Sequence, residues 1–214
     1  RWFVKPQALQ PNPFQEPGDQ VRTNPSRGTG LLIEAAGPVD PTVTFLSVRS
    51  AKGQPVSLLA NYGLHYVGGI PPGQLSADYF GEFARQIASR FKADAASDFV
   101  GIMSNGASGD VNNYRFPDAR PRSHPFERVK AVASLVADRV GATNAMIDFQ
   151  SETTILMNER ELEVGIRQPD VRQLEKAKAL LAQAANPERL TMNEVYAQES
   201  VRLSQAAPTV RIKL

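Results

Sequence analysis

A short apolar run followed at once by ten mostly small, polar residues is the feature that most constrains this chain. The run, Phe99-Val100-Gly101-Ile102-Met103, has the length and composition of a buried strand. The segment after it reads Ser104-Asn105-Gly106-Ala107-Ser108-Gly109-Asp110-Val111-Asn112-Asn113, which is a poor core but a good backbone cradle. Glycine lets the main chain approach a ligand closely, and short polar side chains supply hydrogen bonds. Because ligands bind at the carboxyl ends of strands in open α/β sheets, we expect a binding loop here; a polar turn that satisfies its own backbone is the alternative.

A second apolar run carries one of the two histidines of the chain. Residues 58–69 begin as another buried strand and place His65 shortly before the break Gly68-Gly69. A lone histidine in an apolar run is commonly a hydrogen-bonded structural residue, but neutral imidazole is also the commonest metal ligand. Spacing alone does not decide between these roles, since the chain has no His-x-His, no His-Glu-x-x-His and no cysteine. The other histidine, His124, lies in an Arg- and Pro-rich stretch and is expected to be structural or to face solvent.

The remaining pattern predicts an α/β (α+β) fold, with a mixed β-sheet core and flanking helices. Strand-like runs at 43–48 and 56–60 are separated by a short Gly-containing link, which favours an antiparallel hairpin. Ser76 is a candidate N-cap, and Asp78 falls in the first turn of the helix that follows, where a negative charge suits the helix dipole. The other expected elements are strands near 154–157, 161–164 and 210–214, a helix over 126–139 with Gly141 as its stop, and helices over 170–185 and 191–205.

The chain divides into three parts by composition. Residues 1–30 are rich in proline, which removes backbone donors and fixes φ, so we expect an extended segment lying on a surface rather than a packed helix or strand. Residues 31–150 should hold the core and the site loops. Residues 151–214 should hold strands and an exposed helical hairpin, inserted to cover one side of the site. All three are expected to belong to one larger domain.

Composition excludes several classes of function. The formal net charge is only +2, and no cluster of Lys and Arg exceeds two in a row, so a nucleic-acid partner is not expected. No run of 18 apolar residues occurs, so no transmembrane segment is expected. The absence of cysteine excludes disulfides and Cys-ligated zinc.

Three stretches, in this order, resemble the neutral/alkaline, non-lysosomal ceramidases, in particular their shorter bacterial relatives. Residues 60–65, Ala-Asn-Tyr-Gly-Leu-His, are similar to the family segment in which a strand delivers a zinc-binding histidine. Residues 75–81, Leu-Ser-Ala-Asp-Tyr-Phe-Gly, are similar to the Ser-x-Asp-x-x-Gly pattern that opens the next helix. Residues 109–113, Gly-Asp-Val-Asn-Asn, are similar to the Gly-Asp-Val-Ser-Pro-Asn loop of the nucleophile. The resemblance covers roughly residues 40 to 115.

The resemblance implies a zinc-dependent amidohydrolase of ceramidase type that cleaves ceramide-like lipids to a fatty acid and a sphingoid base. It implies His65 as a zinc ligand and Ser76 and Asp78 as residues supporting the site. The loop supplies Asn105, Gly106 and Gly109 for substrate binding and Ser108, Asp110 and Asn112 for catalysis. The remaining zinc ligands of the family, a histidine upstream and a glutamate and a tyrosine downstream, are expected in flanking parts of the same polypeptide. A secreted or periplasmic, bacterial location is expected.

One departure from the family pattern leaves the chemistry open. Asn112 stands where the family has its catalytic serine, and an amide side chain cannot act as an alkoxide nucleophile. Ser108 is the nearest hydroxyl and therefore the first candidate; a zinc-bound water is the second. The chain is alternatively a hydrolase of another N-acyl amide or of an ester on the same scaffold, or a binding module without enzymatic activity.

Overall fold

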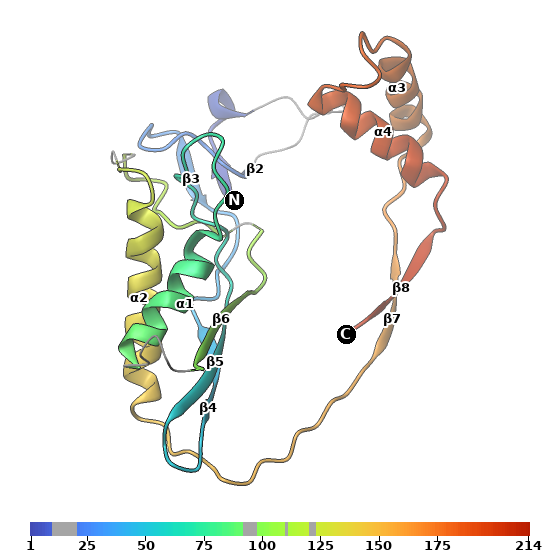
Figure 1. Cartoon of the computed structure of the whole chain (residues 1–214). Helices are drawn as coiled ribbons and strands as arrows, with labels where there is room; N and C mark the ends of the chain where they lie inside the picture. The colour runs from blue at the N-terminus through green and yellow to red at the C-terminus, as the bar shows by residue number, and fades with distance from the viewer. Residues whose placement is uncertain (10–20, 92–97, 110, 120–122) are drawn as a thin grey trace. The chain divides into compact units, whose positions relative to one another are not determined.

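The computed structural model describes residues 1–9, 21–91, 98–109, 111–119 and 123–214 (Figure 1). These residues fall into two compact units, of which the first holds 1–9 and 21–152 and the second holds 153–214. Each unit contains both helices and strands, so the predicted α+β fold class is confirmed. Membership of all 214 residues in one larger domain stays a prediction.

A three-stranded sheet in the order β4-β5-β6 forms the centre of the first unit. β4 (Val43–Arg49) and β5 (Pro55–Tyr62) make the predicted antiparallel hairpin. β5 pairs in parallel with β6 (Val100–Asn105), and the helix α1 (Asp78–Arg90) lies between these two strands in the chain. Because β5 and β6 run in the same direction, their carboxyl ends lie at one edge of the sheet.

The core lies between one face of this sheet and the helices α1 and α2 (Glu127–Asn144), which pack against each other (Figure 1). Apolar residues recur along α1 at helical spacing, which places them on the buried side. On the outer side of the helix pair, the Arg90 guanidinium of α1 donates to Asp138 and Ser134 of α2. The buried cluster consists of Leu58, Ala60, Leu64, Tyr79, Phe83, Ile87, Met103, Val129, Ala133, Val136, Ala137 and Val140.

The opposite face of the sheet is apolar and exposed. Leu46, Leu59 and Ile102 stand opposite one another on the three strands, and each is at least 44% exposed. The prediction of a buried strand over 99–103 is therefore only partly right: of the residues that β6 shares with that run, Met103 alone is buried. An apolar run fits a strand covered on both sides, and within the described residues only one side is covered.

Two sequence-based predictions are corrected in the rest of this unit. Parts of the Pro-rich segment form strands, because β1 (Trp2–Val4) pairs with β2 (Val21–Arg22) and β3 (Leu32–Ala35). These strands contain no proline; Pro6 instead opens a short 3₁₀ helix, η1 (Pro6–Ala8). The helix α2 does not stop at Gly141 but continues to Asn144, since Val140 and Asn144 are both buried and packing extends the helix.

The second unit consists of a helical hairpin and a two-stranded sheet. α3 (Val171–Ala182) and α4 (Met192–Ser204) pack against each other, and both begin with a capping box, at Asp170 and at Thr191. β7 (Glu161–Gly165) pairs antiparallel with β8 (Thr209–Lys213). The strand expected at 154–157 is not formed, although β7 and β8 lie where predicted.

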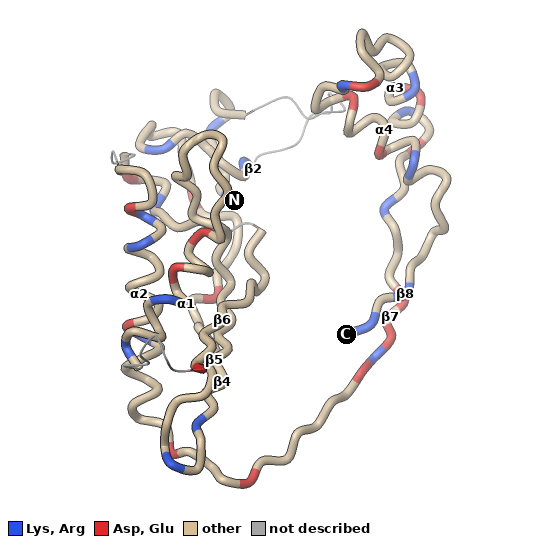
Figure 2. Tube along the Cα trace, viewed as in Figure 1, with Lys and Arg blue, Asp and Glu red and all other residues tan. Residues whose placement is uncertain are grey.

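Charge is distributed without long runs of one sign. Each of the four α-helices carries both basic and acidic side chains (Figure 2). Among the described residues, no helix is both long enough and apolar enough to cross a bilayer.

Candidate functional site

The two sequence segments singled out above meet at the carboxyl edge of the sheet. His65 follows β5 by three residues, and the loop 106–113 follows β6 directly. The backbone N–H of His65 donates to the carbonyl of Val111 at 3.1 Å, and that of Gly106 donates to Tyr62 at 2.9 Å. A Cβ on Gly106 would lie 3.0 Å from Asn61 Oδ1 and 3.2 Å from the nitrogen of Gly63, so glycine is what lets the two segments approach.

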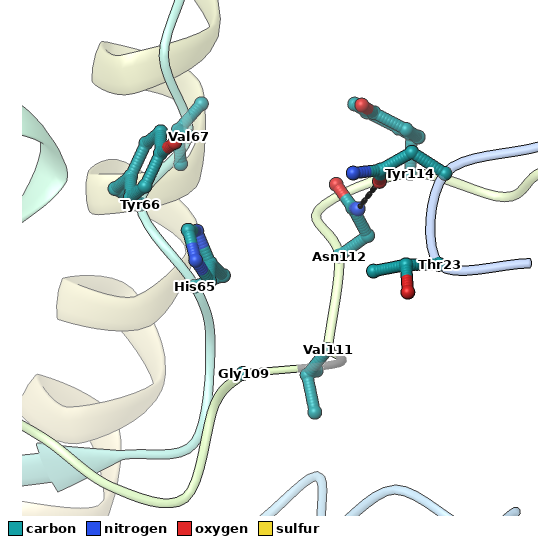
Figure 3. A pocket seen from close by; sticks show the side chains of 9 residues that line it. Thr23, His65, Tyr66, Val67, Gly109, Val111, Asn112 and Tyr114 are labelled. Atoms are coloured by element: carbon teal, nitrogen blue, oxygen red, sulfur yellow. Dashed lines mark hydrogen bonds between the residues drawn. The ribbon is translucent and has the colours of Figure 1, made fainter. Parts of the chain in front are cut away.

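Between these segments lies a cavity of about 270 Å³. Figure 3 shows His65 on one side of it and Asn112 on the other, with Tyr66 and Val67 continuing the wall beside the histidine. The imidazole of His65 is partly buried and packs against the ring of Tyr66, with 4.0 Å between ring centroids and a tilt of 52° between the ring planes. The full lining is Thr23, Asn24, His65, Tyr66, Val67, Gly109, Val111, Asn112 and Tyr114.

Amide side chains fix the far wall of the cavity. Asn112 Nδ2 donates to Asn24 Oδ1 at 3.1 Å, which ties the loop to the N-terminal part of the chain (Figure 3). Asn113 Nδ2 donates to the carbonyl of Val67 at 3.4 Å, which ties the loop to the histidine segment. The Oδ1 atom of Asn112 and the His65 imidazole are among the polar groups of the lining that a ligand bearing an amide or hydroxyls could contact.

Asp78 anchors the chain just beyond His65. Its two carboxylate oxygens accept the backbone N–H groups of Val67 and Gly68, each at 2.8 Å, and its Oδ1 also accepts from Tyr79. Ser76 Oγ accepts from the backbone of Asp78 at 3.0 Å. The prediction that Ser76 is the N-cap is wrong by one residue, since Ala77 holds that position and Ser76 braces the turn before it. Asp78 is in the first turn, as predicted.

Tyr79 supports the same segment from the core. Its side chain is fully buried, and its hydroxyl donates to the carbonyl of Leu64 at 2.9 Å. Burial raises the pKa of the Tyr79 phenol far above its usual range, with the nearby Tyr62 and Asp78 adding to the effect, so the hydroxyl stays protonated as a donor. The residue that precedes His65 is thereby held by a buried hydrogen bond.

The other loop residues proposed from the sequence lie as follows. Gly109 and Asn112 line the cavity. Ser108 is 7% exposed and is not among the lining residues; its carbonyl accepts from Val111 at 3.1 Å. Asn105 is exposed at the end of β6, and Gly106 packs against Gly63. Asp110 lies outside the described residues. The roles assigned to these residues stay predictions.

Three lining residues lie outside the two segments that the sequence analysis singled out: Thr23, Asn24 and Tyr114. Thr23 and Asn24 belong to the Pro-rich segment, which we expected to lie on a surface without contributing to a site. Nothing local marks them, because their place depends on contacts between positions about 88 residues apart in the chain. Tyr114 directly follows the Asn112-Asn113 pair, so extending the loop by one residue would have included it.

A zinc site needs more than the described residues supply. Structural and catalytic zinc sites use three or four protein ligands, whereas no group of three His, Cys, Asp or Glu side chains comes together in the described part of the chain. His65 offers one imidazole at the cavity. The described residues therefore fit a single ligand and not a complete site.

Comparisons with known proteins give little further guidance. No family model and no curated protein matches the chain. A solved structure that does match is the neutral ceramidase from Pseudomonas aeruginosa, with 18% sequence identity and a TM-score of 0.37. The match covers 60% of this chain and only 20% of that one, so the chain spans about a fifth of that protein. At this level of similarity, the functional argument rests on the residues of this chain.

Proposed function

We propose that the chain forms part of a zinc-dependent amidohydrolase that cleaves N-acyl amides of ceramide type. The observation that carries the proposal is the meeting of His65 with the Gly109–Asn112 loop around one cavity, at the carboxyl ends of two parallel strands. Ligands bind at such strand ends in open α/β sheets. The motif resemblance, which runs through both segments in the family order, gives the reaction class.

In this proposal each residue has a separate task. His65 is one ligand of a zinc ion whose remaining ligands lie outside the described residues. The chemistry that bound zinc supplies is polarisation of the amide carbonyl and acidification of a water molecule. Asn112 orients the polar head of the substrate through its amide. Hydrolysis breaks the C–N bond, adding hydroxide to the acyl carbon and a proton to the departing amine.

Water is the nucleophile that the geometry favours. Asn112 cannot attack, and the buried hydroxyl of Ser108 lies outside the cavity lining. An enzyme acting on an N-acyl amide other than ceramide is the second candidate, favoured by the departure at Asn112. A secreted or periplasmic location accompanies both candidates.

The two histidines give a matched test, made on the polypeptide at its natural length. His65→Ala should remove bound zinc and abolish fatty-acid release from N-lauroylsphingosine, because it deletes a ligand. His124→Ala should retain both, since His124 is exposed and lies in a loop outside the cavity. Metal content is measured by mass spectrometry after dialysis. Undiminished zinc in His65→Ala would show that His65 is not a zinc ligand, and an absence of zinc in the unaltered protein would leave a binding module without zinc chemistry.

A further inference from the structure

A second, wider cavity adjoins the first one. Its volume is about 580 Å³, and it shares Asn112 and Tyr114 with the cavity that contains His65. Three arginines and one carboxylate belong to its lining, so the lining alone carries a formal charge of +2, which equals the net charge of the whole chain. The lining is Arg27, Asn112, Asn113, Tyr114, Arg115, Asp118, Ala119 and Arg128.

Arg27 is held at this cavity, and one of its guanidinium N–H groups has no partner among the described residues. Its guanidinium carbon lies 4.1 Å from the centre of the Tyr114 ring, and its Nη2 donates to the carbonyl of Ala119 at 3.3 Å. Its Nε is buried and has no hydrogen-bond partner among the described residues. A buried donor of a charged group left without a partner is costly, so such a group points to a ligand.

The backbone at Gly28, next to Arg27, packs closely against Ala119. Gly28 adopts φ +62° and donates its N–H to the carbonyl of Phe116 at 3.2 Å. A Cβ at this position would meet the Cα of Ala119 at 3.0 Å. Only glycine fits both the conformation and the space, so the Arg27 side chain is held against the segment 114–119.

Arg128 approaches Tyr114 from α2. Its Nε and Nη2 donate to Oδ1 and the backbone carbonyl of Asn113, both of which are neutral acceptors. Its guanidinium carbon lies 5.4 Å from the Tyr114 ring centre. The positive charge of Arg128 is thus fixed in position, and no carboxylate of the described residues pairs with it. The carboxylate of Asp118 in the lining is 3.8 Å from the exposed side chain of Arg115, so among the described residues Arg27 and Arg128 are left without an ion-pair partner.

We propose that this cavity binds an oxyanion, a carboxylate or a phosphate, carried by the same ligand whose acyl amide occupies the His65 cavity. Guanidinium groups bind such anions through charge-assisted hydrogen bonds. The shared residues Asn112 and Tyr114 let one ligand span both cavities. The inference rests on the proposed function and adds that, among N-acyl amides, those with a negatively charged head bind more tightly than neutral ones.

Direct binding measurements test the charge preference without requiring turnover. Three ligands share the lauroyl amide and differ in the head group. N-Lauroylglycine carries a carboxylate, N-lauroylphosphoethanolamine carries a phosphate, and N-lauroylethanolamine carries a neutral hydroxyl. Isothermal titration calorimetry should show at least one charged amide binding about 10- to 100-fold more tightly than the neutral one. The stronger of the two charged amides identifies the anion. Equal affinity for all three ligands would overturn the inference.

Two variants tie that preference to the cavity. Arg27→Gln should remove most of the preference for the charged amide, whereas Arg202→Gln, a matched change on α4 outside the lining, should retain it. Should Arg27→Gln fail to fold, Arg128→Gln replaces it, because Arg128 is the other arginine of the lining that hydrogen-bonds only to neutral acceptors. A preference untouched by both cavity variants would also overturn the inference. Zinc content and ceramide cleavage are measured separately. If the protein binds zinc and cleaves ceramide but does not bind the charged amides more tightly than the neutral one, this inference is refuted and the proposed function is not.

Discussion

Asp78 is the single residue that most directly fixes the histidine segment. One carboxylate accepts two successive backbone N–H groups, of Val67 and Gly68, and also the N–H that begins α1. The residue takes φ +51°, a left-handed conformation that aspartate tolerates better than most residues. The same side chain therefore starts the helix and positions the chain just after His65.

Replacing Asp78 by Asn should loosen this anchor. The amide keeps one acceptor oxygen and turns an NH₂ group toward a backbone N–H that needs an acceptor, so we expect a loss of about 1–3 kcal/mol in the free energy of unfolding. If the anchor orients His65, zinc affinity should also fall about 10- to 100-fold. Ser76→Ala is the control, because it removes one bond in the turn and leaves both loop contacts in place. Urea unfolding and zinc titration measure the two effects; lower stability with unchanged affinity would leave Asp78 a purely structural role.

The site could be predicted from the sequence only where it depends on local order. His65 and Asn112 stand at the ends of apolar runs, and a strand end is visible in the sequence. Arg27 and Tyr114 carry no such signal, because their environment comes from residues about 90 positions away, such as Ala119 for Arg27. Stacking of a guanidinium on an aromatic ring has no sequence period, so it escapes analysis by pattern.

At the scale of the element, β5 shows how the sheet divides into a covered and an open face. Leu58 is completely buried under α1 and α2, whereas its neighbour Leu59 points to the other face and is 44% exposed. Leu58→Ala should cost about 2–5 kcal/mol through lost burial and a cavity. Leu59→Ala should cost about 1 kcal/mol or less. Chemical unfolding of the two variants measures the difference; equal costs would mean that the open face is covered in solution.

Helices and strands could be predicted from the sequence where turn or capping residues within the element determine it. The hairpin β4–β5 follows from a short Gly-containing link, and the helix α4 begins within one residue of the expected position because Thr191 caps it; both are found. The expected strand over 154–157 is absent, although Ile155 and its neighbours have β propensity, because a strand also needs a partner to pair with. Conversely, β1 is only three residues long, and its pairing with β3 supplies what its sequence does not show.

At the scale of the whole molecule, burial is distributed unequally between the two units. Every member of the main hydrophobic cluster belongs to the first unit. In the second unit, the described residues that are buried are Ala177, Ala197 and Ser200, all small. A two-stranded sheet without a covered face is marginally stable, and every residue of β8 is exposed. Stability should therefore differ strongly between the units.

Native-state hydrogen exchange, read by mass spectrometry, tests this difference. Amides of β5 and α1 should exchange only through global opening, because their hydrogen bonds lie over the buried cluster. Amides of β7 and β8 should exchange fastest, and those of α3 and α4 at intermediate rates, since capping boxes and mutual packing stabilise the hairpin but little apolar surface is buried. Leu58→Ala supplies the control: it should accelerate exchange in β5 and α1 and leave β7 and β8 unchanged. Protection of β7 and β8 equal to that of β5 would contradict this ranking. Strands with side chains this exposed can be so well protected only if another surface covers them.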